Sequence, residues 1–285
     1  MPDTTLARTC VVCGSARSRE ELQLSAEWRV RRCESCGLRS LDPEPDPDQL
    51  VEVFDNGEIY EGAFLLREDI MARHAETLAA LEFRVKPGHL LDVGCGPGFF
   101  LEAARVRGWQ GTGVDPSPFS VRQIQSLGFE GHQGLLHEVD LPEASFDAVS
   151  LLQVVEHLVD PRELLEGCKR LLKPGGVLLV ATPNPASLLA RAQRERFNYW
   201  IPPVHCVWYT PRTLKAALAN AGFKNVKTKT WSARAKTQHD GVAALLSTKL
   251  GRRLPARTHW RAAELLARTA DATGFGSIVE ATAIR

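Results

Sequence analysis

Apolar and polar positions follow two different periods along the middle of the chain. Short runs of apolar and β-branched residues predict buried strands, whereas longer segments with apolar residues every three or four positions predict amphipathic helices. The two kinds of segment alternate from residue 89 to residue 181. Such alternation is typical of a mostly parallel sheet with helices on both faces. We therefore expect an α/β fold.

The expected strands are short and evenly spaced, at 89–93, 111–114, 131–133, 147–152 and 177–181. We expect helices to follow the first, second and fourth of them, ending near 107 and spanning 118–127 and 161–172. Two further strands, 222–227 and 277–281, are expected to close the sheet, with helices at 238–250 and 259–272 inserted between them. Before the sheet, the pattern predicts helices at 47–53 and 64–85.

The N-terminal segment has too little apolar mass for a core of its own, and it contains four of the seven cysteines. They form two C-x-x-C pairs, 19 residues apart, and a glycine follows each pair: Cys10, Cys13, Cys33 and Cys36, with Gly14 and Gly37. This spacing predicts a closed, structural four-thiolate zinc site. Disulfide pairing is the alternative, and an intracellular chain disfavours it. Three alternating prolines at 43–47 indicate a semi-rigid linker after this segment.

Composition limits the class of protein. A chain of 285 residues with 44% hydrophobic content is expected to fold around a core, and a formal net charge of +1 gives no general attraction to nucleic acid or anionic membranes. Its first residues lack the pattern of a signal peptide, and no apolar run is long enough for a membrane span. We therefore expect a cytoplasmic protein without membrane or nucleic-acid partners.

The most informative stretch is 90–98, where a buried strand leads into the alternating glycines Gly94, Gly96 and Gly98. Such a turn opens a helix and lets a ligand approach the backbone closely. Asp115 ends the next expected strand, about twenty residues further on. An acid at that place accepts hydrogen bonds from ribose hydroxyls. The alternative role for Asp115 is to cap the helix that begins after Pro116.

Four blocks occur in a characteristic order along the chain: 91–98, Gly113-Val114-Asp115, Phe146-Asp147-Ala148-Val149 and Leu172-Lys173-Pro174-Gly175-Gly176. Together they resemble the class I S-adenosylmethionine-dependent methyltransferases. The resemblance implies a Rossmann-like, seven-stranded, mostly parallel sheet with helices on both faces. The cysteine-bearing segment resembles zinc-ribbon extensions of bacterial methyltransferases. The implied domains are a ribbon at 1–40, a linker and helices covering the cofactor cleft at 41–85, and a methyltransferase domain at 86–285 with a helical insertion at about 233–275.

The resemblance also implies the residues that bind S-adenosylmethionine: Asp92, Gly94, Gly96, Gly98, Asp115, Pro116, Leu135 and Gln153. Gly98 is the glycine best suited to the alternative role of close helix packing. Relatives commonly carry an acid near the turn after the third strand, which is absent at 133–136.

The segment 198–210 combines aromatic residues, two prolines and His205 in the position where this fold places its acceptor-binding loop. His205 and Tyr209 are the candidate catalytic residues. His205 is a general base or a group that orients the acceptor, or it fixes the loop by a backbone hydrogen bond. Tyr60 is expected either to cover the ligand or to pack. We interpret Glu156 and His157 as structural residues of a turn, and we expect no second metal site.

We therefore expect a methyltransferase that modifies oxygen, nitrogen or carbon of a small molecule. One alternative is an RNA or protein methyltransferase that recognises its substrate through the ribbon and a basic segment at 249–261. The other is a non-catalytic binding protein that retains the cofactor fold. The sequence leaves the acceptor and the oligomeric state open.

Overall fold

The computed structural model describes residues 9–46, 50, 61–232, 265 and 267–285. Its main sheet has seven strands in the order β10-β11-β8-β7-β4-β5-β6. Neighbouring strands from β8 to β6 pair in parallel, whereas β11 pairs antiparallel with β8 and β10. This confirms the predicted Rossmann-like sheet. The strands are β4 (His89–Val93), β5 (Gln110–Asp115), β6 (Glu130–Gln133), β7 (Phe146–Leu152), β8 (Leu172–Pro183), β10 (Lys224–Trp231) and β11 (Ile278–Ile284).

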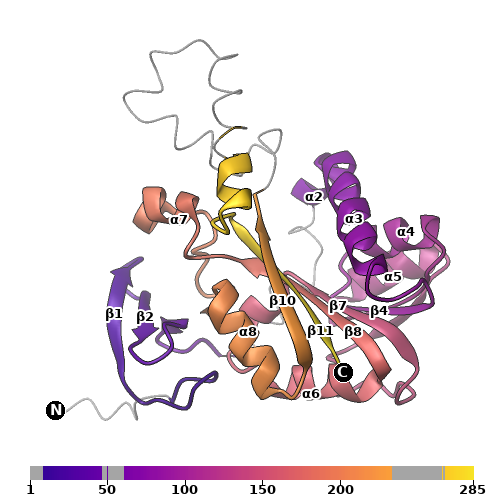
Figure 1. Ribbon diagram of the computed structural model, residues 1–285, viewed down its shortest axis with the longest axis horizontal. Coiled ribbons are helices and arrows are strands. Elements are labelled where there is room, and N and C mark those ends of the chain that lie inside the picture. Colours follow the sequence, from indigo (N-terminus) through magenta and orange to yellow (C-terminus); the bar gives the residue numbers. More distant parts are fainter. Residues whose placement is uncertain (1–8, 47–49, 51–60, 233–264, 266) are drawn as a thin grey trace.

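Helices cover both faces of the sheet, as the alternation of elements predicts (Figure 1). One face carries α3 (Arg67–Glu82), α4 (Phe99–Val106) and α5 (Pro118–Ser126), and the other carries α6 (Arg162–Leu171) and α8 (Pro211–Asn220). Alternate residues of one strand point to opposite faces. Leu90 of β4 accordingly packs with the first set of helices, and Leu91 packs with the second. The sheet therefore lies between two apolar layers.

Several boundaries differ from those that the sequence predicts. β8 begins at Leu172, so the Lys173-Pro174-Gly175-Gly176 block lies inside a strand. The predicted helix at 64–85 is two helices, α2 (Glu61–Leu65) and α3, because Leu66 leaves helical geometry with φ −105° and ψ 13°. The predicted helix at 238–250, the basic segment 249–261 and Tyr60 lie outside the described residues. The predicted helix at 47–53 is described only at Leu50.

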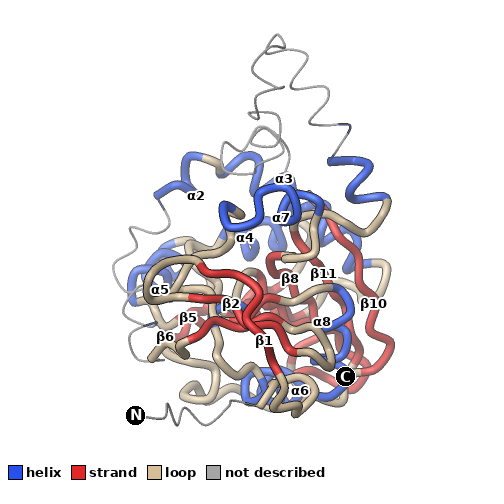
Figure 2. The backbone as a smooth tube through the Cα atoms, turned by 90° about the vertical axis from the view of Figure 1, so that its left-hand side faces the viewer, coloured by secondary structure: helices blue, strands red, loops and turns tan. Residues whose placement is uncertain are grey.

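The cysteine-bearing segment forms a second, antiparallel sheet with β1 (Ser18–Gln23), β2 (Arg29–Cys33) and β3 (Arg39–Asp42). A fourth strand, β9 (Val207–Trp208), comes from the predicted acceptor loop and pairs with β3. Figure 2 looks onto this ribbon, with the main sheet behind it. The backbone N–H of Leu41 also donates to the Cys206 carbonyl at 2.8 Å. The ribbon is thus joined to the loop by backbone hydrogen bonds.

Apolar contacts also cross from the ribbon to the rest of the chain. Val30 and Leu41 pack against Trp208, whereas Val12 and Leu38 belong to the main core. The ribbon therefore shares its core with the α/β part. Within the described residues, no helix has the length and the apolar character needed to cross a membrane.

Two glycines, Gly98 and Gly128, have similar backbone conformations but different surroundings. Replacing each by alanine therefore distinguishes the cost of backbone strain from the cost of a steric clash. Gly98 has φ +85° and a Cβ there would lie 2.6 Å from Ile124 Cγ2, whereas Gly128 has φ +81° and open space around it. We expect Gly128→Ala to cost about 1–2 kcal/mol through the left-handed backbone alone. Gly98→Ala should cost about 1–3 kcal/mol more through overpacking. Urea unfolding of both variants measures the difference, and equal losses would contradict the packing role of Gly98.

Candidate functional site

The carboxylate at the end of β5 holds the glycine loop that follows β4. Asp115 Oδ2 accepts from the Gly96 N–H at 2.8 Å, and Oδ1 accepts from the Ser117 N–H at 2.9 Å. Gly94 and Cys95 donate backbone N–H groups to the Val114 carbonyl at 2.7 and 3.3 Å. These bonds fix the loop against the tip of the neighbouring strand. The cap of α5 is the Ser117 side chain, so Asp115 does not serve as the helix cap that the sequence left open.

A cavity of about 700 Å³ opens at these strand ends. Five of the predicted cofactor residues line it: Gly94, Asp115, Pro116, Leu135 and Gln153. The cavity continues along apolar side chains of the turn after β6, the turn after β7 and helix α6, including Leu136, Leu158, Val159 and Leu164. The other predicted cofactor residues, Asp92, Gly96 and Gly98, do not contribute to its lining. A ligand with one polar and one apolar end fits such a lining.

Asp92 is buried behind the loop and accepts a hydrogen bond of 2.6 Å from the Ser150 hydroxyl. Burial, reinforced by the nearby Asp115 carboxylate, raises the pKa of Asp92 to about 7. Burial also raises the pKa of Asp115, against the opposing effect of its backbone donors. The Gly96 and Ser117 N–H groups favour the charged form, and the side chain lies in the lining of the cavity.

Gln153 follows β7 with φ +58°, a left-handed conformation that is uncommon for a residue other than glycine. Its N–H donates to the Ala181 carbonyl at 2.8 Å, which anchors this conformation to β8. Backbone strain of this kind concentrates at functional sites. Gln153 lies in the cavity lining, and its role toward the cofactor stays a prediction.

The turn after β6 differs from the expected arrangement. The N–H of Leu135, one of the predicted cofactor-binding residues, donates to Glu138 Oε2 at 2.7 Å. Glu138 lies two positions beyond the stretch 133–136, which holds no acid, and it does not contribute to the cavity lining. Leu135 therefore contributes its apolar side to the cavity while Glu138 occupies its N–H.

His205 and Tyr209, the two candidate catalytic residues, do not line the cavity. Tyr209 is 1% exposed and packs in the main core. His205 is buried, and its Nδ1 donates to the Tyr199 carbonyl at 2.9 Å. Burial lowers the pKa of His205 to about 3, so the ring is a poor acceptor for a hydroxyl proton. The geometry favours the third role considered for His205, which is to fix the loop.

His157, interpreted from the sequence as a structural residue of a turn, also lies at the cavity. This residue belongs to a 3₁₀ turn, η2 (Val155–His157), and lines the cavity beside Gln153. Its Nδ1 lies 2.9 Å from the Val204 carbonyl, and its ring meets the His205 ring edge-on at 4.9 Å. Burial lowers the pKa of His157, so it is neutral near pH 7. The signal in the sequence is the Glu156-His157-Leu158 segment, which begins three positions after Gln153.

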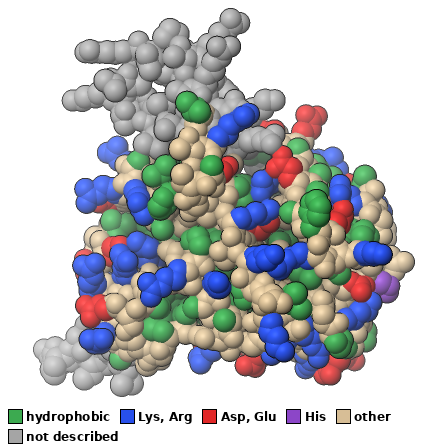
Figure 3. Space-filling model, in the orientation of Figure 1, with side chains coloured by type: hydrophobic (Ala, Val, Ile, Leu, Met, Phe, Trp, Pro, Cys, Tyr) green, Lys and Arg blue, Asp and Glu red, His purple; other side chains and the backbone are tan. Residues whose placement is uncertain are grey.

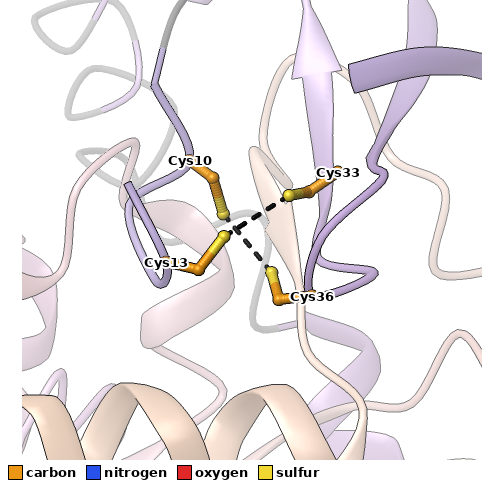
Figure 4. Close-up of side chains that lie close together, drawn as sticks. All are labelled: Cys10, Cys13, Cys33 and Cys36. Atoms are coloured by element: carbon orange, nitrogen blue, oxygen red, sulfur yellow. Dashed lines mark hydrogen bonds between the residues drawn. The ribbon is translucent and has the colours of Figure 1, made fainter. Parts of the chain in front are cut away.

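The four N-terminal cysteines converge from two knuckles on one point (Figure 4). The Sγ atoms of Cys10 and Cys36 are 3.5 Å apart, as are those of Cys13 and Cys33. Tetrahedral zinc with Zn–S bonds of about 2.3 Å places sulfurs about 3.8 Å apart, so the geometry fits a zinc ion. Gly14 and Gly37, at φ +70° and +84°, return a backbone N–H to the first cysteine of each knuckle.

Charged side chains are mixed on the face seen in Figure 3, where Lys and Arg are interspersed with acidic and apolar groups. Many of the basic groups are paired, for example Arg39 with Glu21 at 2.6 Å and Lys229 with Glu280 at 2.8 Å. This distribution agrees with the formal net charge of +1. On this face, the described side chains form no large patch of a single sign.

Residues 66–228, more than half of the chain, match a family model described as a methyltransferase domain. The fold is also that of a SAM-dependent methyltransferase from Archaeoglobus fulgidus, with a TM-score of 0.55 and 25% identity over 77% of this chain and 94% of the other. The chain belongs to the S-adenosylmethionine-dependent methyltransferase family. A methyltransferase structure from Thermotoga maritima, with a TM-score of 0.58 and 19% identity, covers 83% of this chain and 98% of its own and shows the fold alone.

Curated relatives of this methyltransferase include ubiquinone biosynthesis O-methyltransferases. That of Caulobacter vibrioides is 36% identical over 143 residues, which are 46% of this chain and 57% of the relative. That of Azorhizobium caulinodans is 31% identical over 168 residues, which are 55% of this chain and 66% of the relative. The chain thus spans little more than half the length of the first of these relatives.

The stability of the ligand-free methyltransferase should depend on Asp92 in a direction set by its pKa. The folded-state pKa of about 7 lies above the ordinary 3.8, so the folded state binds the proton more tightly. Ionisation of Asp92 therefore destabilises the protein progressively from pH 4 to pH 7. We expect Asp92→Asn to gain stability relative to wild type over that range, as measured by urea unfolding.

Asp147 provides a control of opposite sign. It pairs with Lys173 at 2.7 Å and accepts from the His89 N–H at 2.8 Å, and these partners lower its pKa despite partial burial. Its stabilising effect is present at neutral pH and disappears as the pH falls below 4. Asp147→Asn should thus lose stability at pH 7. A parallel pH profile for the two variants would refute this assignment.

Loss of one ribbon thiolate should remove one zinc ion. We expect Cys36→Ser to purify with one equivalent of zinc less than wild type, because three thiolates leave the closed site incomplete. Metal analysis measures the loss, and hydrogen exchange of β1–β3 should accelerate because metal binding and folding are coupled. Ser35→Ala, an exposed neighbour in the same knuckle, is the matched control. Unchanged zinc content in Cys36→Ser would exclude the site.

Proposed function

We propose that this chain transfers a methyl group from S-adenosylmethionine to the hydroxyl oxygen of an apolar small molecule. The observation that carries the proposal is a cavity that joins Asp115 and Gln153 to an apolar lining from η2 and α6. The curated relatives named above, which are O-methyltransferases by name, support oxygen as the acceptor atom.

The strand ends form the cofactor half of the proposed site. Asp115 uses two acceptor directions for backbone N–H groups, and a carboxylate has about four, so it retains capacity for ribose hydroxyls. At Gly94 a Cβ would lie 2.6 Å from Val154 Cγ2, so a side chain there would disturb the neighbouring lining. Pro116, Leu135 and Leu136 supply apolar surface for a base. These features fit an adenosyl ligand and explain the need for glycine in the loop.

The acceptor half of the proposed site begins at His157 and Leu158 and continues to α6. S-adenosylmethionine supplies a methyl group on a sulfonium, whose sulfur leaves with its bonding electrons. The residues of this chain therefore have to align the acceptor oxygen and exclude water, and alignment alone contributes up to about 7–11 kcal/mol. The apolar side chains Leu136, Val159 and Leu164 serve the exclusion of water.

We further infer that Cys10, Cys13, Cys33 and Cys36 bind a structural zinc ion. Four thiolates fill a tetrahedral coordination shell, which leaves no position for a substrate. We retain as a proposal the division into a ribbon at 1–40, a linker and covering helices at 41–85, and a methyltransferase domain at 86–285. The contacts of the ribbon with β9 support a role for the zinc ion in holding the acceptor loop.

Cofactor binding should depend on the Asp115 carboxylate. Asp115→Asn keeps the size of the side chain but removes its charge, and a hydrogen bond to a charged group contributes about 1.5–3 kcal/mol. We expect S-adenosylhomocysteine to bind about 10- to 100-fold more weakly, as measured by isothermal titration calorimetry. Asp147→Asn, which removes a carboxylate from the opposite end of the sheet, should bind normally. Normal binding by Asp115→Asn would remove Asp115 from its role.

A separate assay tests the acceptor. The protein is incubated with labelled S-adenosylmethionine and matched panels of small phenols, amines and carbon acids, and the products are identified by mass spectrometry. We expect methylation in the phenol panel. Transfer confined to the amine or carbon-acid panel would contradict the choice of oxygen.

A further inference from the structure

A glycine occupies the middle of α6, where the backbone does not require one. Gly167 lies inside α6 (Arg162–Leu171), and it is not among the described glycines with positive φ. It therefore neither ends the helix nor adopts a left-handed conformation. Glycine within a helix destabilises the fold relative to alanine, because it loses more backbone freedom on folding. The reason for this glycine therefore lies in what surrounds it.

Gly167 belongs to the face of α6 that borders the cavity. The cavity-lining residues of this helix recur every three or four positions, which places them on one side of it: Glu163, Leu164, Glu166, Gly167 and Arg170. Leu164 and Gly167 are partly buried, whereas the three charged side chains are exposed. The wall formed by α6 is thus apolar inside and charged at its outer rim.

Leu136, from the turn after β6, lies directly opposite Gly167. A Cβ at position 167 would lie 3.2 Å from Leu136 Cδ2 and 3.7 Å from Leu136 Cγ. Leu136 is 5% exposed and packs in the main core, so close packing limits its retreat. A side chain longer than a methyl group at position 167 therefore has to turn into the cavity. The missing side chain keeps this part of the cavity open.

We propose that Gly167 is a specificity-determining residue, whose missing side chain makes room for an alkyl group of the acceptor between α6 and Leu136. The proposal rests on the proposed function, because it takes this part of the cavity to hold the acceptor rather than the cofactor. Leu158 and Val159, from the turn after β7, continue the same apolar lining. The space between a helix backbone and one leucine suits an unbranched chain better than a branched one. The acceptor class is thereby narrowed to hydroxyl compounds that carry an unbranched alkyl substituent.

The charged rim sets a limit to the length of that substituent. A methylene group that leaves water raises affinity about fourfold. A methylene group that reaches Glu163, Glu166 or Arg170 stays in contact with water and charged side chains, so it brings no such gain. We therefore expect the affinity for the acceptor to rise with alkyl length and then to level off.

A purely structural role of Gly167 predicts a different result. If the glycine serves only the close packing of α6 against Leu136, a side chain there changes the free energy of unfolding and leaves the preference for alkyl length as it is. The dependence of acceptor affinity on alkyl length consequently distinguishes the two roles.

The test measures binding of 4-alkylphenols to the full-length protein by isothermal titration calorimetry, with S-adenosylhomocysteine held at saturation. The series runs from 4-methylphenol to its longer straight-chain homologues. We expect wild type to gain about fourfold in affinity for each added methylene until the increase levels off. Gly167→Leu should bind 4-methylphenol as wild type does and gain nothing from longer chains. A wild-type affinity that is independent of alkyl length, or equal length profiles in wild type and Gly167→Leu, overturns the proposal.

Smaller changes decide the question if Gly167→Leu does not fold. Gly167→Ala should move the plateau to shorter chains by about one methylene, because its methyl group fills the space of one. A double variant with Leu136→Val, which removes one carbon from the opposite wall, should move the plateau back. An unchanged plateau in Gly167→Ala would overturn the proposal.

Lys169→Leu is the matched control. It places a leucine on the same helix but outside the cavity lining, so it should keep the wild-type length profile. Affinity for S-adenosylhomocysteine reports on folding in every variant. The same loss of alkyl preference in Lys169→Leu and Gly167→Leu would show a general effect on α6 and contradict a specific role for Gly167.

The failure of this inference and the failure of the proposed function give different results. Methyl transfer to phenols with the same length profile in wild type and Gly167→Leu would refute the role of Gly167 and leave the proposed function intact. Length-dependent binding that Gly167→Leu abolishes, without methyl transfer to any phenol, would refute transfer to oxygen and retain the alkyl subsite. A protein that binds S-adenosylhomocysteine but none of the phenols would refute both.

Discussion

The backbone of Cys206 carries the interaction on which the arrangement of the site depends. Its N–H donates to the Glu156 carbonyl at 2.7 Å, and its carbonyl accepts from the Leu41 N–H at 2.8 Å. One residue thus joins the ribbon, the loop before β9 and the 3₁₀ turn that follows β7. Because these groups are buried, each would lose a hydrogen bond without gaining water if the segments separated. The positions of His157 and His205 follow from this connection.

The ribbon therefore contributes to more than its own stability. β3 extends a small sheet into the loop, and Trp208 fills its core beside Val30 and Leu41. The Trp208 Nε1–H also donates to the Tyr199 carbonyl at 2.9 Å, the same oxygen that accepts from His205. A change in the cysteine knuckles is consequently connected to the acceptor loop through β3 and β9. This is a mechanical connection, in which packed strands transmit displacement.

The site concentrates features that stability alone would disfavour. Asp92 and Glu156 are buried carboxylates with raised pKa values, and Gln153 has a left-handed backbone. Each raises the free energy of the folded state, and the apolar layers on both faces of the sheet offset that cost. These unfavourable features, two buried carboxylates and one left-handed residue, lie together at the ends of the strands that border the cavity. Elsewhere in the described residues the buried positions are mainly apolar.

The amino-acid pattern alone determined the α/β class, the strand centres, the two cysteine knuckles and the place of Asp115. These features depend on hydrophobic period and on turns of a few residues, which neighbouring side chains decide. Only the tertiary structure decided the pairing of β3 with β9, the approach of His205 to Glu156 and His157, and the burial of Tyr209. Those contacts join segments far apart in the chain, and they depend on which surfaces the packed sheet brings together. The hydrophobic pattern of a single segment does not predict these contacts, because they result from burial and hydrogen bonding across the whole fold.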